Sequence, residues 1–471
     1  MREAIAVIDK TGRGHAICSA LIETNPNLYV YYIPGTGGVF DQRIIPVSSI
    51  SIDQPEKIRK YCLANDISLV VVSHIDALKS GVADILRKSG ILVMGPSAEA
   101  VQIESSKWFC KSICDEAGIA TPDAKLYEDR TTFINFLMVR PAKPIIVKAD
   151  WLTCNGNGAF VVEPKATVAE VLHQIDRLIA QNPGSPFRLL VETYLEGIDY
   201  SAHYLVNDRS VIELPSSQDF KKSHDGDQGQ NCDGMASISP HPRETAELQR
   251  TIRSEILNPM LACLRTRGIR YNGPIYLGLR IDESGQPHLI EVNARMGDSE
   301  SEVIFPRVIE NLSAVFSQIA NEMTEDRAIL YKPDVALALS VVTGPTNIIS
   351  YSSDNFEADW PNCNQGRKRE ITYSPKQIAK GGLIFWANVD RDIDGTLLTR
   401  TGRIAHVVGL GPSLHSARRN AYASLRSVMF EGMRWRSDIG MTTPLHNLRS
   451  LNIPSKEDGK VCTNSKTLKF N

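Results

Sequence analysis

The chain has 471 residues, of which 42% are hydrophobic and 23% are charged, and its formal net charge is −2. This length predicts several domains, because single hydrophobic cores stop growing at about 250–300 residues. The composition is typical of a soluble globular protein. The small net charge excludes a general nucleic-acid-binding protein, whose surface would be strongly basic. No apolar run approaches the roughly 20 residues needed to span a bilayer, so no membrane association is expected.

The N-terminal segment MREAIAVIDK is a short apolar strand between charged residues and is not a signal peptide. The nine cysteines show no spacing typical of a disulfide framework. Cys110 and Cys114 lie one helical turn apart without a second ligand pair, which favours buried or free thiols. An odd cysteine count without a secretion signal points to a reducing compartment. We therefore expect a cytoplasmic protein, either a monomer or a homodimer.

Strands and helices alternate over the first hundred residues. Strands are predicted at 4–8, 28–33, 67–73 and 91–95. This alternation predicts a doubly wound α/β domain over residues 1–100, with ligands at the carboxyl ends of its strands. Gly12, Arg13 and Gly14 open the first helix, where free N–H groups and the helix dipole would suit an anion such as phosphate. A plain tight turn with a solvent-facing Arg13 is an equal alternative.

Two lysines follow in segments that could approach a phosphate. The segments are a helix at 97–120, a strand at 144–150 and a strand–loop–strand at 151–163. The helix carries Lys107, the strand ends in Lys148, and the loop contains Gly156 and Gly158. A glycine-bearing hairpin beside a lysine can fold its backbone N–H groups over phosphates. The segment lacks the pattern of a P-loop, so an ordinary hairpin is an equal alternative.

Two strands are predicted within 187–206, separated by the polar break VETYLEGID. This break would expose backbone groups to the edge of a base and would position Asp199 for ribose hydroxyls. Residues 215–242 are predicted to form a long polar, glycine-rich loop that contains Asp225 and Asp227. A structureless stretch of that length is usually functional or disordered. A helix at roughly 245–267 and a strand at 273–281 complete this region.

The segment HLIEVNARMGDSESE, residues 288–302, begins as a buried strand. Glu291 and Asn293 lie two residues apart, so both side chains leave the same face of that strand. A carboxylate and an amide oxygen side by side suit Mg²⁺, which takes oxygen ligands and shares its shell with substrate phosphates. Arg295 at the strand end would clamp an anionic substrate. An ordinary strand with a solvated polar end is the alternative, and the E-x-N pattern alone favours it.

Short strands with polar turns and a helix at 413–430 predict a small α+β domain over residues 333–440. We assign residues 101–332 to a central domain that includes a lid subdomain at about 121–192. Residues 441–471 are rich in Lys, Ser and Asn and are expected to be a poorly ordered tail.

Several motifs occur together and in one order. The segment SSQDFKKSHDGDQGQNCDGM resembles TSQDHKR-x-x-DGD-x-GPNTGGM, and IEVNARMGDSE resembles IEFN-x-RFGDPE. The segments TGRGHAI, PGTGG, MGPSAEAVQIESSKWFCK and RWRSDIG resemble GGREHAL, PGN-x-G, GPT-x-x-A-x-LE-x-SK-x-F-x-K and YR-x-DIG. All these patterns are those of the phosphoribosylamine–glycine ligases, a family of ATP-grasp ligases. The resemblance covers residues 1–440.

This resemblance implies an ATP-grasp fold with an N-terminal doubly wound (pre-ATP-grasp) domain and a small C-terminal α+β domain. It implies an ADP-forming ligase that phosphorylates a carboxylate with ATP and lets an amine attack the acyl phosphate. The expected cofactors are ATP and Mg²⁺ or Mn²⁺, and the expected partners are small molecules. The expected reaction joins glycine to phosphoribosylamine in purine biosynthesis.

The family's roles transfer by position to residues of this chain. The nucleotide would be held by Lys107, Lys148, Gly156, Gly158, the adenine hinge at Glu192, Tyr194 and Leu195, and Asp199 at the ribose. The metal would be held by Glu291 and Asn293. Substrates would meet Gly12, Arg13, Gly35, Asp219, Lys221, Asp227, Asn231, Arg295 and Asp298, with Arg295, Lys148 and Asp225 as catalytic residues.

The chain also departs from the family's patterns. The glycine-rich loop ADGLAAGKGV is ADWLTCNGNGAF here, so Trp151 replaces a glycine and Asn157 stands where the loop has lysine. The pattern VGPE-x-PL is VSHIDAL, at 72–78, which lacks a carboxylate expected near the sugar. These changes gather in the lid and on the acceptor side. ATP use is therefore the firmer expectation. The alternatives are a specialised paralogue that ligates a different acid and amine, and a non-catalytic nucleotide-binding paralogue.

Overall fold

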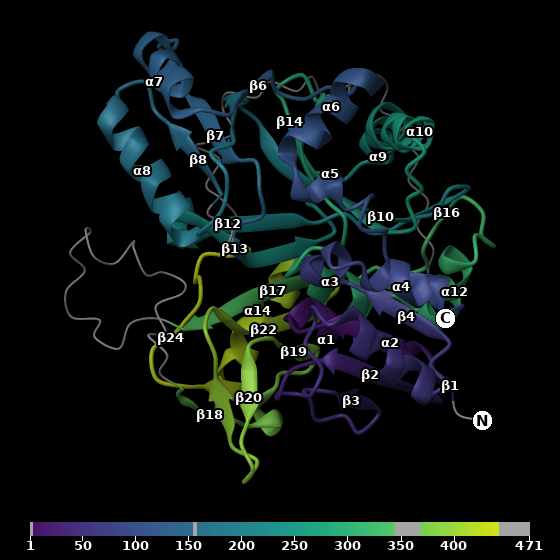
Figure 1. Ribbon diagram of the computed structural model, residues 1–471. Helices are drawn as coiled ribbons and strands as arrows, with labels where there is room; N and C mark the ends of the chain where they lie inside the picture. Colours follow the sequence, from purple (N-terminus) through teal and green to yellow (C-terminus); the bar gives the residue numbers. More distant parts are fainter. Residues whose placement is uncertain (1–2, 154–157, 344–367, 442–471) are drawn as a thin grey trace, which may run out of the picture.

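The computed structural model describes residues 3–153, 158–343 and 368–441 (Figure 1). Within these ranges, no helix is both long and apolar enough to cross a membrane. Gly156 and Asn157 of the expected glycine-rich loop lie outside the described residues, as does almost all of the expected tail.

The N-terminal part is a parallel five-stranded sheet. Its strands lie in the order β3 (Ile44–Pro46), β2 (Leu28–Pro34), β1 (Glu3–Asp9), β4 (Leu69–Val72) and β5 (Leu92–Met94). Its helices are α1 (Gly12–Thr24), α2 (Pro55–Ala64), α3 (Ile75–Lys79) and α4 (Val82–Lys88). Alternate residues of β1 pack in different clusters, Ile5 with residues of α1 and Ala6 with residues of α2 and α4. Both faces are therefore buried, which explains the continuous apolar runs of these strands and confirms the predicted doubly wound domain.

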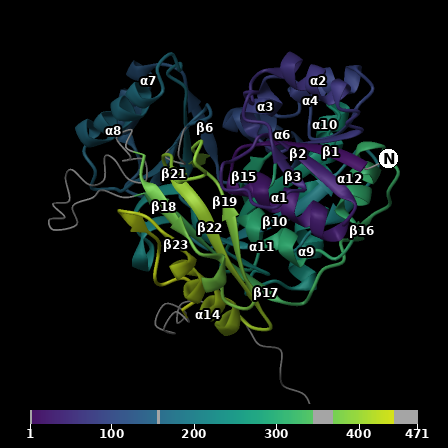
Figure 2. The same ribbon diagram turned by 90° about the horizontal axis from the view of Figure 1, so that it is seen from below.

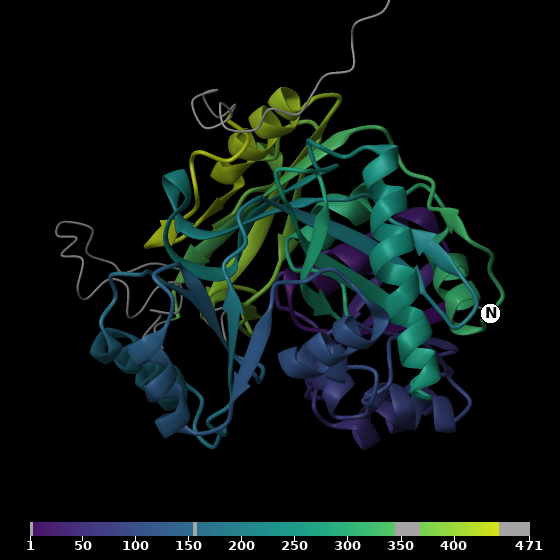
Figure 3. The same ribbon diagram turned by 90° about the horizontal axis from the view of Figure 1, so that it is seen from above.

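The central part has two sheets. One has the order β15 (Pro287–Asn293), β14 (Gly273–Ile281), β10 (Ile198–Val206), β11 (Val211–Glu213) and β16 (Arg327–Ala328). The other has the order β6 (Ala124–Tyr127), β9 (Leu189–Thr193), β7 (Ile145–Ala149) and β8 (Ala159–Val162), and it carries α7 (Arg130–Val139) and α8 (Val168–Gln181). This smaller unit stands apart from the N-terminal part when the molecule is seen from the front and from above (Figures 1 and 3).

The remaining helical segments of the central part cover the larger sheet and lead to the C-terminal part. They are α9 (Ala246–Ile252), the π-helical η3 (Arg253–Leu257), α10 (Asn258–Thr266), α11 (Glu300–Ile304), η4 (Phe305–Arg307) and α12 (Leu312–Ala320). The segments α9, η3 and α10 follow one another without a gap, in agreement with the predicted helix at roughly 245–267.

The predicted single helix at 97–120 is wrong. The chain forms α5 (Gln102–Ser105) and α6 (Lys107–Ala117), separated by Ser106 with extended backbone angles. The Ser106 hydroxyl oxygen accepts a hydrogen bond from the N–H of Phe109, so it caps α6 in place of continuing the helix. Lys107 therefore occupies the first turn of a new helix.

The predicted long loop at 215–242 is also wrong over most of its length. It forms the hairpin of β12 (Gln218–His224) and β13 (Gln228–Ser239), joined by the 3₁₀ turn η2 (Asp225–Asp227). Strand β13 pairs antiparallel with β17 (Val335–Thr343). Because this partner lies about a hundred residues further along the chain, the local sequence carries no sign of the pairing.

The C-terminal part contributes short strands and one helix. They are β18 (Glu370–Tyr373), η5 (Pro375–Gln377), β19 (Gly382–Trp386), β20 (Val389–Arg391), β21 (Leu397–Thr399), β22 (Arg403–Gly411), α14 (Leu414–Ser424), η6 (Leu425–Ser427), β23 (Val428–Met429) and β24 (Met433–Arg434). The helix predicted at 413–430 ends at Ser424. One sheet runs in the order β12, β13, β17, β22, β19 and so joins the central and C-terminal parts (Figure 1). Its strands β17, β22 and β19 lie beside one another in Figure 2. The expected domain limits stay predictions.

Candidate active site

The side chain of Lys148 lies near the end of β7 and points to the facing strand β9. Its Nζ lies 2.6 Å from Oε2 of Glu192 and donates to the carbonyl of Ile290 at 3.1 Å. The other carboxylate oxygen of Glu192 lies 3.1 Å from Nζ of Lys111 on α6. Glu192 and both lysines are buried. This double ion pair fixes Lys148 in one position, and sequence reasoning missed Lys111.

The break at Ser106 brings Lys107 to the same place. Both the hydroxyl of Ser106 and the N–H of Trp108 donate to Oδ1 of Asp150, at 3.0 and 2.9 Å. The start of α6 is thereby tied to the end of β7. Burial and the nearby charge of Lys148 lower the pKa of Lys107. Two ammonium groups this close need negative charge between them, as polyphosphate provides.

Glu291 is the carboxylate that faces these lysines. Gly278 lies opposite it on β14, and a Cβ at that glycine would lie 2.7 Å from Cγ of Glu291, so only glycine leaves room there. Oε1 of Glu291 accepts a hydrogen bond from Nζ of Lys221 at 2.7 Å. Lys221, with Lys148 and Lys107 behind it, lowers the pKa of Glu291 to about 2. The carboxylate is therefore ionised at every physiological pH.

Two further carboxylates lie beside Lys221: Glu300, which is buried, and Asp219, which is half-buried. Burial, together with the charge of Glu300, raises the pKa of Asp219 well above its usual range. Burial also raises the pKa of Glu300. Oδ1 of Asp219 makes no hydrogen bond although it is buried. Carboxylate oxygens gathered here, beside Glu291 on its strand, suit a divalent cation that takes oxygen ligands.

Arg295 follows Asn293 at the end of β15, and Glu104 of α5 holds it in place. Nη2 of Arg295 lies 3.2 Å from Oε1 of Glu104, while Oε2 of Glu104 accepts from the N–H of Ala294 at 2.7 Å. Sequence reasoning gave Glu104 no role, although it stands at the acidic position of the quoted A-x-LE-x-SK pattern. The quoted motif therefore already contained the residue that holds Arg295.

Tyr194 and Leu195 of the predicted adenine hinge lie between β9 and β10, whereas Glu192 belongs to β9. Arg280 of β14 donates to the carbonyl oxygen of Leu195 at 3.2 Å and pairs with Oδ1 of Asp199 at 2.7 Å. Tyr194 is 40% exposed, and the side chain of Asp199 is 54% exposed. Arg280 thus holds both the hinge backbone and the predicted ribose ligand, and nothing in the local motif identified it.

Asp225 and Asp227 lie at the far tip of the β12–β13 hairpin. Oδ1 of Asp225 accepts from the N–H of Ser437 at 2.8 Å, and Asp227 pairs with Arg436 at 2.8 Å. Both carboxylates therefore bind residues 436–437 of the C-terminal part. Asn231 lies opposite Lys222 further along the hairpin. The substrate and catalytic roles of these residues stay predictions.

At the first helix, where an anion was expected, the carboxylate of Asp9 makes the contacts that the structure describes, and phosphate binding by Gly12 and Arg13 stays a prediction. The carboxylate of Asp9 accepts from the N–H groups of Lys10 and Thr11 at 2.6 and 2.8 Å, and it pairs with Arg13 at 2.8 Å. Arg13 is only 3% exposed, so the alternative of a solvent-facing side chain is wrong.

Four of the residues that were predicted to bind substrate or nucleotide have a constrained backbone or close contacts within the chain. Gly35 ends β2 with a φ of +77°, which favours glycine. Gly12 contacts Glu302 and His406 so closely that a Cβ would lie within 2.6 Å of each of them. Asp298 pairs with Arg403 at 2.9 Å. At the lid loop, a Cβ on Gly158 would lie 2.4 Å from the hydroxyl oxygen of Thr153. Substrate and nucleotide binding by these four residues stays a prediction.

Comparisons with known proteins agree with this geometry. Residues 3–104, 105–301 and 358–442 match the N domain, the ATP-grasp (A) domain and the C domain of phosphoribosylglycinamide synthetase. The phosphoribosylamine–glycine ligase of Nostoc sp. is 30% identical over 438 residues, covering 93% of this chain and 98% of that protein. The ligase of that name from Ralstonia nicotianae is 31% identical over 439 residues, with 93% and 98% covered.

Solved structures give the same result. The phosphoribosylamine–glycine ligase of Thermotoga maritima has a TM-score of 0.72 and 25% sequence identity, and the match covers 92% of this chain and 99% of that one. The biotin carboxylase domain of the Hydrogenobacter thermophilus 2-oxoglutarate carboxylase has a TM-score of 0.66 at 16% identity, which shows a shared fold alone. The expected fold class is confirmed. With its match to relatives along nearly their whole length, the chain belongs to the phosphoribosylglycinamide synthetase family and is an ATP-grasp ligase.

Proposed function

We propose that this protein joins glycine to phosphoribosylamine at the expense of ATP, forming glycinamide ribonucleotide, ADP and phosphate. One observation carries the proposal: Lys221 donates to the carboxylate of Glu291 at 2.7 Å, and Lys148 donates to the carbonyl of the preceding Ile290 at 3.1 Å. Clustered cations beside a magnesium-type carboxylate suit phosphoryl transfer, which depends mainly on positioning and charge neutralisation. The relatives matched over their full length carry the name of this reaction.

The reaction has two steps. A carboxylate oxygen of glycine attacks the γ-phosphorus of ATP, the bond from that phosphorus to the bridging oxygen breaks, and ADP leaves. The amine nitrogen of phosphoribosylamine then attacks the acyl carbon of glycyl phosphate. The bond from that carbon to the phosphate oxygen breaks, phosphate leaves, and the nitrogen loses a proton.

We assign the nucleotide to Lys107 and Lys148, whose ammonium groups would neutralise its phosphates. The hinge carbonyl of Leu195, held by Arg280, faces the position proposed for adenine. Arg295, fixed by Glu104, would bind the acyl phosphate. Asp219 and Glu300 offer negative charge to an ammonium or amine group beside it.

Glu291 and Asn293 are the residues that would hold Mg²⁺ or Mn²⁺. Their oxygen donors on one strand, beside the carboxylates of Asp219 and Glu300, fit a hard divalent ion. When bound, the ion would supply positive charge to the transferring phosphoryl group. The 2-oxoglutarate carboxylase domain that shares this fold was solved with the magnesium salt of ADP.

A second candidate is a ligase that uses a different amine. It is favoured by the segment Ser73–His74–Ile75, which stands where the family pattern has Gly-Pro-Glu. The hydroxyl of Ser73 donates to Asp9 at 2.7 Å, and Nδ1 of His74 accepts from the N–H of Asp76 at 3.2 Å. The carboxylate expected near the sugar is therefore replaced by side chains that serve the fold.

The test measures release of ADP and phosphate from ATP and Mg²⁺ with glycine, with and without phosphoribosylamine generated in the assay. Turnover that needs both substrates supports the proposal. ADP formation only with another acid or amine favours the second candidate. No turnover with any pair, despite ATP binding, would overturn both.

Two matched variants locate the chemistry. Glu291→Gln removes the charge of the proposed metal ligand and should abolish turnover. Glu283→Gln changes an exposed residue in the turn before the same strand and should leave turnover intact. Equal activity of the two variants would contradict the assigned metal ligand.

A further inference from the structure

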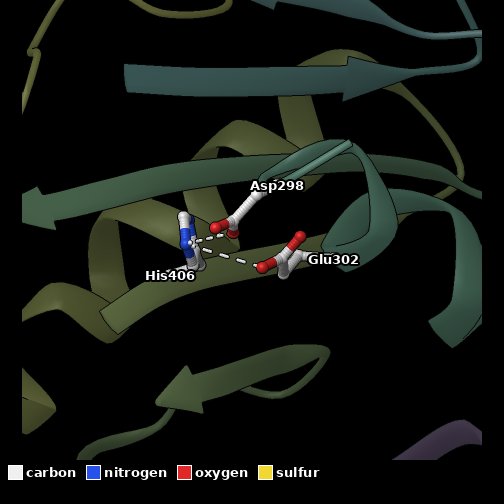
Figure 4. A group of neighbouring side chains, drawn as sticks. All are labelled: Asp298, Glu302 and His406. Atoms are coloured by element: carbon white, nitrogen blue, oxygen red, sulfur yellow. Dashed lines mark ion pairs between the residues drawn. The ribbon is translucent and has the colours of Figure 1, made fainter. Parts of the chain in front are cut away.

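Three ligating atoms converge at the junction of the N-terminal, central and C-terminal parts (Figure 4). Asp298 lies in the turn after β15, Glu302 on α11 and His406 on β22. Nε2 of His406 lies 3.2 Å from Oδ1 of Asp298 and 3.5 Å from Oε1 of Glu302. All three atoms lie within 4.8 Å of one another. Glu302 and His406 are fully buried.

The hydrogen bonds around His406 fix which ring nitrogen carries the proton. The hydroxyl of Ser340 donates its one hydrogen to the carbonyl of Gly234 at 2.8 Å. The same hydroxyl oxygen lies 3.1 Å from Nδ1 of His406 and must therefore accept from it. In the neutral imidazole, Nε2 then bears a lone pair, and this lone pair faces the two carboxylates.

The three facing atoms have no donor among them and no hydrogen bond elsewhere. The charges do not balance either. Arg403 is paired with Oδ2 of Asp298 at 2.9 Å, and Arg13 is paired with Asp9. The charge of Glu302 is left over in a buried place. Burying unpaired charge and facing lone pairs is strongly unfavourable, so either a metal ion or a shared proton must lie between these atoms.

In each of the three residues, the polar side-chain atom that faces away from the centre makes a hydrogen bond. Nδ1 of His406 donates to Ser340, and Oδ2 of Asp298 accepts from Arg403. Oε2 of Glu302 accepts from the N–H of Ser299 at 3.2 Å. Proteins orient metal ligands in this way, with the second ring nitrogen and the second carboxylate oxygen fixed by hydrogen bonds.

We propose that Asp298, Glu302 and His406 bind a divalent transition metal ion of the Zn²⁺ or Mn²⁺ type. One imidazole and two carboxylates form a ligand set that suits such ions. Metal–ligand bonds of about 2.0–2.1 Å in a tetrahedron separate neighbouring ligand atoms by about 3.3 Å. The observed 3.2 and 3.5 Å agree with that separation. A charge-assisted N–H···O bond would be shorter, at about 2.7–2.9 Å.

This centre is separate from the proposed magnesium site. It contains an imidazole, which suits transition metals, whereas Glu291 and Asn293 offer only oxygen. Its turn is also unusual: Ser299 has a φ of +114°, and the proline of the quoted family pattern could not adopt this angle. The ion would hold α11 and β22 together against Gly12 of α1, and so would join all three parts.

The test uses the full chain. It is dialysed in a buffer that is free of transition metals and contains excess Mg²⁺. Elemental analysis should find one transition metal ion per chain. If dialysis has removed the ion, titration with Zn²⁺ or Mn²⁺ should restore one ion per chain. Binding of the ion should raise the Tm. Co²⁺ in its place should give visible absorption typical of low-coordinate Co²⁺. Sub-stoichiometric binding without a change in Tm would overturn the proposal, since a shared proton would then be the cation.

Variants show where the metal binds. His406→Leu removes a ligand at similar volume, and Glu302→Gln retains an oxygen that can accept from Ser299. Each should weaken metal binding by about tenfold or more and remove the Co²⁺ absorption. Glu291→Gln, in the other site, should retain both. Unchanged metal content in a folded Glu302→Gln variant would contradict the assignment even if His406→Leu fails to fold.

Discussion

The residues that govern the active site act largely by holding one another. Lys148 is fixed by Glu192, which is also paired with Lys111, and Arg295 is fixed by Glu104. Such positioning matters because a misplacement of about 1 Å can lower the rate of an enzyme about a hundredfold. The effect of a substitution should therefore depend on whether it removes a reacting charge or a support.

Glu104→Gln should separate these two effects. The amide oxygen can still accept from the N–H of Ala294, but the ion pair with Arg295 is lost. We expect kcat to fall by about tenfold or more while the KM for ATP changes little, since Glu104 is not among the residues assigned to the nucleotide. Steady-state kinetics checks this, with Glu99→Gln, an exposed neighbour, as the control. A rise in the KM for ATP alone would show that Arg295 does not act on the reacting carboxylate.

Asp219→Asn should stabilise the protein while it impairs turnover. The folded-state pKa of Asp219 is raised above its unfolded value of about 3.9, so the folded state binds the proton more tightly. This carboxyl therefore lowers stability as the pH rises from about 4 through the folded-state pKa. In EDTA, the Tm of the variant should exceed that of the natural protein at pH 8, and the difference should shrink toward pH 4. A lower Tm at pH 8 would contradict the assigned charge.

At the scale of elements, the start of α6 shows how a break in a helix serves the site. Ser106→Ala removes the cap to Phe109 and the hydrogen bond to Asp150. We expect the free energy of unfolding to fall by about 1–2 kcal/mol. The KM for ATP should rise, because Lys107 follows the cap. Urea unfolding and kinetics test this against Ser254→Ala, which removes only a hydroxyl bond within its own helix. Equal unfolding midpoints for the two variants would exclude the capping role.

The elements were predicted well where local pattern determines them. The apolar runs of β1, β2 and β4 and the spacing of Glu291 and Asn293 are local signals. The break at Ser106 depends on Asp150, which lies more than forty residues away. The hairpin at Asp225 depends on pairing with β17. Glu104, Lys111 and Arg280 act through contacts distant in sequence; Glu104 and Lys111 stood within a quoted motif, whereas Arg280 did not.

At the scale of the whole molecule, residues 436–438 bind the tip of the β12–β13 hairpin. Arg436 is 2% exposed and bonds Asp227, Asp438 and the carbonyl of Lys222. Arg436→Met should lower the free energy of unfolding by about 2 kcal/mol, since hydrogen bonds from a buried guanidinium to two carboxylates are lost. Arg419→Met, on the exposed face of α14, should be close to neutral. Denaturant melts compare the two, and equal midpoints would refute this link.

The sheet that joins β13 to β17 and β22 also sets an order of events during synthesis. Ala236 pairs with Leu339, and Leu339 pairs in turn with Val407. The hairpin that carries Asp219 and Lys221 therefore keeps the β13 edge unpaired until the ribosome has made β17. Open strand edges invite pairing with other chains. A nascent chain released before β17 is complete would therefore expose this edge to aggregation.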